Sequence, residues 1–124
     1  MKYAVALRVE NIERTETSGI LLISLSGIEK PFTFKLELPE QLVVSKISED
    51  DAVNMLLSSD PISPEDLSEY GSPIIILNGT VFKRSKEGEE IKYWISIHGL
   101  QLRFTGRDDF LADVSTIWIG LAKQ

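Results

Sequence analysis

The sequence YWISIHGLQLRFT, at residues 93–105, carries an apolar side chain at every second position on both sides of His98-Gly99. A period of two is typical of β-strands, because successive side chains point to opposite faces of the sheet. We therefore predict strands at residues 91–98 and 100–105. The side chains that we expect to point into the core are Tyr93, Ile95, Ile97, Leu100, Leu102 and Phe104.

The same pattern extends through most of the chain. Further alternating or continuous apolar runs occupy residues 3–9, 20–25, 32–38, 74–84 and 114–121. The polar residues 10–19 end the first run, and Gly27, Pro31 and Gly88 mark turns. About eight short strands with almost no helix are typical of an antiparallel barrel, because closure removes unpaired strand edges. We therefore predict an all-β, eight-stranded antiparallel barrel.

Two segments leave alternatives open. In residues 48–57, Ser48 and Asp51 have the spacing of a helix cap, whereas the apolar residues 53, 55 and 57 alternate as in a strand. Asn78-Gly79 is a hairpin signal, but it lies within an apolar run where a bent, continuing strand is equally consistent.

One connection differs from the rest. Residues 60–73 hold three of the five prolines, with acidic residues between them. We predict a mobile loop there, with one short helical turn starting near Ser63. A chain of 124 residues has room for one hydrophobic core, so we expect a single domain over residues 1–124.

Charge and hydropathy argue against two classes of partner, nucleic acids and membranes. The formal net charge is −6, with 13 basic and 19 acidic residues, which argues against nucleic acid as the main partner, because such binding depends on cations that neutralise phosphates. There is no apolar run of about 18 residues and no signal-peptide pattern, so we expect a cytoplasmic protein without a membrane partner.

The sequence also lacks the residues of a catalytic or metal site. It has one histidine and no cysteine, and the acidic runs 49–51, 87–90 and 108–109 do not have calcium-loop spacing. No glycine-rich phosphate loop occurs. We expect no enzymatic activity, no metal, no cofactor and no small-molecule substrate.

Gly79-Thr80-Val81-Phe82-Lys83-Arg84 and residues 93–106 resemble the eighth subunit of eukaryotic nuclear RNA polymerases and its archaeal counterpart. The resemblance runs nearly end to end and implies an eight-stranded barrel related to the OB-fold. The family has glycines where Gly79, Gly99 and Gly106 stand and an arginine matching Arg103. The resemblance favours a strand at residues 53–57 and places Asn78-Gly79 inside a strand. The short chain and the different loop at 60–73 favour an archaeal member.

What the resemblance implies is a non-catalytic polymerase subunit, whose partners are the other subunits and chiefly the largest one, and which supports assembly or stability. The alternative is a stand-alone OB-type module for single-stranded nucleic acid. In that alternative the stacking residues are Trp94, Tyr93 and Phe104, and the phosphate-binding residues are Lys83, Arg84 and Arg103.

Strand alternation places Trp94, His98, Arg103 and Trp118 on the outside of the barrel. Tryptophan and arginine dominate binding energy at protein interfaces, so these residues are the candidate partner interface. The alternative is that the two tryptophans lie in a minor core under the protein's own loops. We expect His98 to be structural and Gly79 and Gly99 to lie inside strands at barrel corners.

Overall fold

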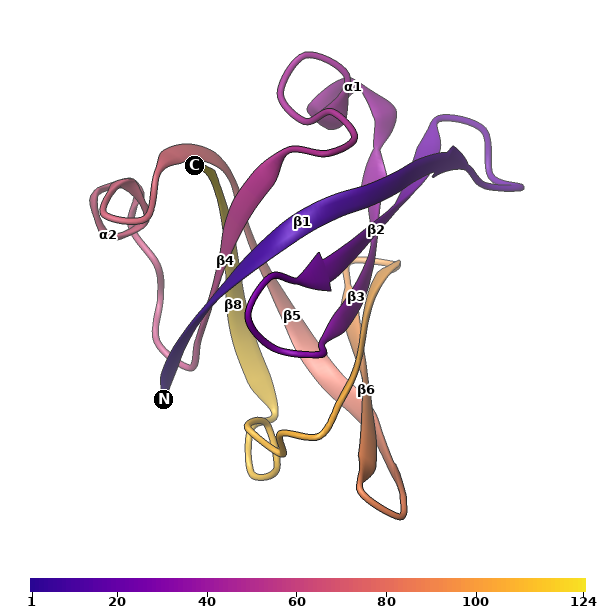
Figure 1. Ribbon diagram of the computed structural model, residues 1–124, viewed down its shortest axis with the longest axis vertical. Helices are drawn as coiled ribbons and strands as arrows, with labels where there is room; N and C mark the ends of the chain where they lie inside the picture. The colour runs from indigo at the N-terminus through magenta and orange to yellow at the C-terminus, as the bar shows by residue number, and fades with distance from the viewer.

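The computed structural model describes residues 1–124 and confirms the all-β class (Figure 1). Eight antiparallel strands form a closed barrel in the order β1-β2-β3-β7-β6-β5-β8-β4. Their bounds are β1 Lys2–Arg14, β2 Ile20–Gly27, β3 Thr33–Pro39, β4 Ala52–Ser58, β5 Ser72–Glu87, β6 Glu90–Ile97, β7 Leu100–Gly106 and β8 Thr116–Lys123. Two short helices are present, α1 Glu40–Val43 and α2 Pro64–Ser68, and no helix is long and apolar enough to cross a bilayer.

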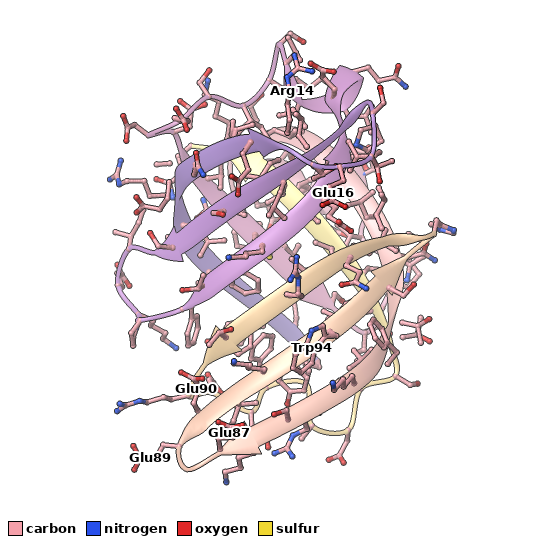
Figure 2. All side chains as sticks on the ribbon, turned by 90° about the vertical axis from the view of Figure 1, so that its right-hand side faces the viewer. Arg14, Glu16, Glu87, Glu89, Glu90 and Trp94 are labelled. Carbon is pink, nitrogen blue, oxygen red and sulfur yellow. The ribbon has the colours of Figure 1, made fainter.

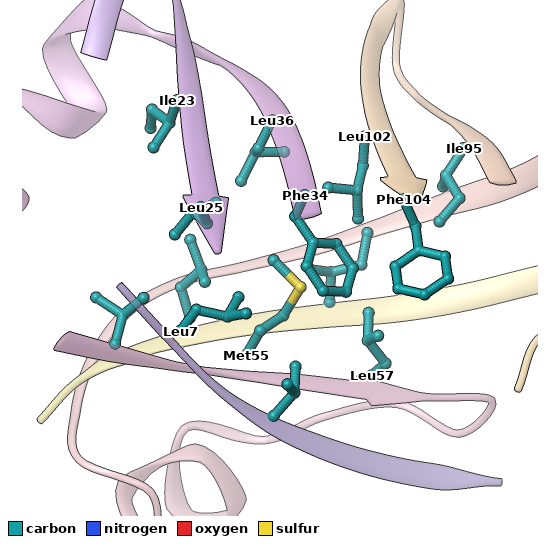
Figure 3. Close-up of a cluster of buried hydrophobic side chains, with 14 of the residues drawn as sticks. Leu7, Ile23, Leu25, Phe34, Leu36, Met55, Leu57, Ile95, Leu102 and Phe104 are labelled. Carbon is teal, nitrogen blue, oxygen red and sulfur yellow. The ribbon is translucent and has the colours of Figure 1, made fainter. Parts of the chain in front are cut away.

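The core fills the barrel interior with the inward side chains of the strands (Figure 3). The alternation predicted for β3 and for β6 is confirmed: Phe34, Leu36, Tyr93 and Ile95 are fully buried. Leu100, at the start of β7, is only half-buried, because it follows the turn where the barrel wall ends.

Two strands are longer than the sequence predicted. Residues 10–14, of which only Ile12 is apolar, continue β1 to Arg14 after an irregularity between Val9 and Asn11, and residues 11–14 pair with β2 alone. Ile12 packs against the core, but a single apolar residue does not establish an alternating pattern, so this extension could not be predicted from the sequence. β5 likewise extends three residues past Arg84 and forms the hairpin to β6.

Local elements close both ends of the barrel. At one end, α1 and the residues after it bury Val43 and Ile47; this turn of helix was not predicted. At the other end, the β7–β8 loop inserts Phe110 and Leu111. The ring of Phe110 stacks on Tyr3 with centroids 4.6 Å apart.

The predicted helical turn in residues 60–73 is α2. Ser63 Oγ accepts from the backbone N–H of Asp66, and the Asp66 carboxylate accepts from the backbone N–H of Ser63, which together form a capping box. Leu67 and Ile62 are buried in a second apolar cluster with Leu56 and Ala122 on the outside of the barrel. The mobility of this segment stays a prediction. The strand at residues 52–58 is confirmed.

The two glycines predicted inside strands differ. Gly79 does lie inside β5, where an added Cβ would stand 2.5 Å from the carbonyl oxygen of Ser96 on β6. Gly99 does not lie in a strand. With His98 it forms the two-residue turn between β6 and β7, and both have positive φ, 49° and 90°, as type I′ hairpin turns require. Gly106, at the end of β7, faces the rings of Phe104 and Phe32.

Candidate functional site

One outer face of the barrel carries a row of cations around a tryptophan. Lys35 on β3 pairs with Arg103 on β7, Arg103 pairs with Trp94 on β6, and Trp94 pairs with Lys83 on β5. These residues therefore stand side by side across four neighbouring strands. Figure 2 shows Trp94 on this outer face. We call the row, with the adjacent Thr33, Thr105 and Lys92, the Trp94 face.

The contacts within the row leave binding capacity unused. The Lys83 ammonium lies 4.7 Å from the centroid of the Trp94 ring, a cation–π contact. Lys35, Lys83 and Arg103 form no ion pair. The Nε of Arg103 is buried without a hydrogen-bond partner. Lys35 and Arg103 are directly opposed like charges, an arrangement that destabilises a sheet unless something neutralises it.

Carboxylates border the row on both sides. On one side Glu37 accepts from the backbone N–H of Gln101 at 2.8 Å. On the other side Glu90 lies 3.8 Å from Lys92, close to Glu87 and Glu89 at the tip of the β5–β6 hairpin (Figure 2). The positive charge is therefore confined to a band that runs across the strands.

The Trp94 face is hollowed but does not form a ligand pocket. Its depression has a volume of about 230 Å³ and is lined by Thr33, Lys35, Lys92, Trp94, Arg103 and Thr105, with parts of Tyr93 and Phe104. Sites for small molecules usually measure roughly 300–1,000 Å³ and are mainly apolar. A surface of this kind suits a flat or extended partner.

The structure brings together two of the four predicted interface residues. Trp94 and Arg103 are cross-strand neighbours. His98 lies in the β6–β7 turn, with its Nε2 3.1 Å from Asn78 Oδ1. Trp118 packs against the second apolar cluster under α2, so the minor-core alternative holds for Trp118. It does not hold for Trp94, whose ring belongs to no apolar cluster.

Sequence reasoning missed two residues near this face. Lys35 was recognisable as outward-pointing, but its position beside Arg103 depends on β3 pairing with β7, which the sequence order does not reveal. Phe82 is 52% exposed at the irregularity between Val81 and Lys83 in β5. An extra residue in one strand shifts the facing of its neighbours, so simple alternation does not locate it.

The stacking residues of the nucleic-acid alternative are mostly inaccessible. Tyr93 and Phe104 are both 0% exposed and lie in the core, so neither presents a ring face to a base. Arg84, assigned there to phosphate, is instead paired with Asp109. Trp94 is the one stacking residue of that set outside the core.

The polar cluster around Asp109 holds the β7–β8 loop in place. Arg84 Nε donates to Asp109 Oδ1 at 2.9 Å, a second guanidinium nitrogen donates to Oδ2, and the Tyr93 hydroxyl donates to Oδ1. The bonds from Arg84, then from Tyr93, lower the pKa of Asp109 to about 2. Burial, and then the bond to Asp109, raises the pKa of Tyr93 to about 12. These groups connect the loop to β5 and β6.

No three histidine or acidic side chains come together as metal ligands. The fold and this face define a small closed-barrel protein with an aromatic and cationic outer surface. Residues 2–118 match the RpbG family, whose description is the G subunit of DNA-directed RNA polymerase. The chain belongs to this family, and it is therefore a component of a polymerase complex whose partners include other polymerase subunits.

No curated protein matches the chain. A solved structure with an overall likeness is that of the cytoplasmic molybdate-binding protein ModG in its molybdate-bound form. The match covers 97% of this chain and 89% of that chain, at 12% identity and a TM-score of 0.37, which is too low to support an inference.

Proposed function

We propose that this chain is a non-catalytic subunit that docks on the outside of the largest subunit of an archaeal, cytoplasmic RNA polymerase through the Trp94 face. In this role it supports the assembly or stability of the enzyme. Membership of the RpbG family supports a place in the polymerase complex. The Trp94 face supports the choice of docking surface.

The observation that carries the proposal is the pairing of Trp94 with Arg103 on an open strand face. A tryptophan gives a large contact area at low entropic cost, and an arginine gives up to five donors in a rigid plane. Arg103 uses none of its donors for an ion pair within the chain, and its Nε has no partner. That Nε is itself buried, but Arg103 as a whole is only half-buried, so a partner that covers Trp94 can accept from the other guanidinium nitrogens.

The non-catalytic role is supported by how the reactive side chains are used. The one histidine contacts Asn78 beside the β6–β7 turn, and Tyr93, Arg84 and Asp109 brace a loop. His98 shares a depression with Ser96, Thr80 and Thr116, but its hydrogen bond goes to Asn78 and not to a hydroxyl, so no nucleophile and base are paired there.

Reconstitution with omitted subunits tests the choice of partner. The polymerase is assembled from separately produced subunits, with one left out at a time, and the products are separated by size exclusion. We expect this chain to co-elute with the assembly only when the largest subunit is present. Co-elution in its absence contradicts the proposal.

A further inference from the structure

We propose that the occupant of the Trp94 face is an extended, acidic protein segment that crosses the strands and carries carboxylates on both sides of an apolar residue. The inference rests on the proposed function, because it names the chemistry of the partner that docks there. It is carried by the order and charge of the row Lys35–Arg103–Trp94–Lys83.

The dimensions of the row match a short extended segment. Neighbouring strands lie about 4.8 Å apart, so Lys35 and Lys83, three strands apart, are separated by about 14 Å at the backbone. An extended chain rises about 3.3 Å per residue, and every second side chain points the same way. Five residues therefore span the row. The first side chain of the segment faces Lys35 and Arg103, the third faces Trp94, and the fifth faces Lys83.

The charges select the residue types in such a segment. Two cations stand at one end of the row and one at the other, and none of the three has a carboxylate partner in this chain. This occurs although the chain has 19 acidic residues against 13 basic ones. An acidic residue at one end of the segment relieves the repulsion between Lys35 and Arg103, and an acidic residue at the other end pairs with Lys83. An apolar residue in the middle packs on the indole of Trp94.

A polynucleotide fits the same surface poorly. The row is only about 14 Å long, and carboxylates flank it along the strands. Glu37 lies on one side, and Glu87, Glu89 and Glu90 lie on the other (Figure 2), so the surface supports few phosphate contacts. Tyr93 and Phe104 are buried, so the row offers one ring for stacking. A short acidic segment uses the cations without reaching these carboxylates.

Photo-crosslinking in the assembled polymerase tests the inference. Thr33 is exposed beside the row, and replacing it with p-benzoylphenylalanine leaves Trp94 and the cations intact. A matched probe at Val44, 68% exposed beside α1, serves as the control. Crosslinked peptides are identified by mass spectrometry. We expect the Thr33 probe, and not the Val44 probe, to capture a subunit segment with at least two carboxylates within about five residues.

Any other crosslinking result overturns the inference. The particular result also shows whether the proposed function fails with it. Capture of a neutral or basic segment of another polymerase component refutes the acidic partner but keeps the docking face. Capture of nucleic acid, or no capture at all, refutes both.

Charge reversal provides a second readout on the same assembly. Lys35→Glu should weaken binding to polymerase that lacks this subunit by about tenfold or more, since it places a carboxylate opposite the partner's acid. Lys46→Glu makes the same change in net charge at an exposed position in no ion pair and should change binding less than about twofold. Equal effects of the two variants contradict the inference.

Discussion

Replacing Gly79 by alanine should destabilise the barrel by about 2–3 kcal/mol, the upper range for inserting atoms where no space exists. The added Cβ would stand 2.5 Å from the Ser96 carbonyl oxygen and 3.0 Å from side-chain atoms of both Ile95 and Ile97. A backbone oxygen in a ladder cannot rotate away as a side chain can. Relief therefore requires β5 and β6 to separate, with a loss of pairing between them.

Thermal unfolding measures the effect. For a chain of this length, 1 kcal/mol corresponds to about 4 °C, so the midpoint of Gly79→Ala should fall by about 8–12 °C. Gly88→Ala is the matched control. Gly88 has a φ of 62° and open space around it, so alanine there should cost only about 1 kcal/mol of conformational strain. If Gly79→Ala melts at or above the midpoint of Gly88→Ala, the close approach of β5 and β6 is not the reason why glycine is needed at position 79.

Three further outcomes follow from the structure. The bonds from Arg84 and Tyr93 hold the Asp109 pKa at about 2, below its ordinary value of 3.8. This contribution to stability is therefore complete above about pH 4 and is lost as the pH falls toward 2. In acid unfolding curves between about pH 5 and 2, wild type should lose more stability than Asp109→Asn, and parallel curves would refute this. Leu67→Ala should cost about 2–4 kcal/mol in chemical denaturation, because Leu67, on α2, is fully buried against Leu56 and Ala122 of the barrel; a cost below about 1 kcal/mol would mean that α2 is not anchored by it. The isolated protein should bind single-stranded DNA only weakly at physiological salt, and submicromolar affinity with a salt slope of about four phosphates or more would favour the nucleic-acid alternative.

The strands were predictable where side-chain alternation is strict. In β3, β6 and β7 one face is buried and the other meets water, so composition follows the period of the backbone. Alternation failed in residues 11–14 of β1, where backbone bonds to β2 hold a segment in which Ile12 is the one apolar residue. Gly99 was expected inside a strand, but the apolar positions change from odd to even numbers across His98-Gly99, as they do where a two-residue turn separates two strands.

The candidate site was predictable only in part. Alternation correctly placed Trp94 and Arg103 on the outside. It placed Trp118 there too, but what covers an outward side chain depends on distant segments, and α2 supplies that cover. The cationic row depends on β3 pairing with β7, which brings Lys35 beside Arg103. This long-range strand order is not contained in the local pattern.

The affinity of Trp94→Ala with Arg103→Glu for polymerase that lacks this subunit tests the central claim most directly. Loss of an aromatic anchor costs about 2 kcal/mol or more, and reversal of the arginine adds repulsion, so the dissociation constant should rise by about 100- to 1,000-fold. The free variant should unfold cooperatively, within about 0.5 kcal/mol of wild type, since both side chains lie outside the core. A folded variant that binds the polymerase with wild-type affinity would contradict docking through the Trp94 face.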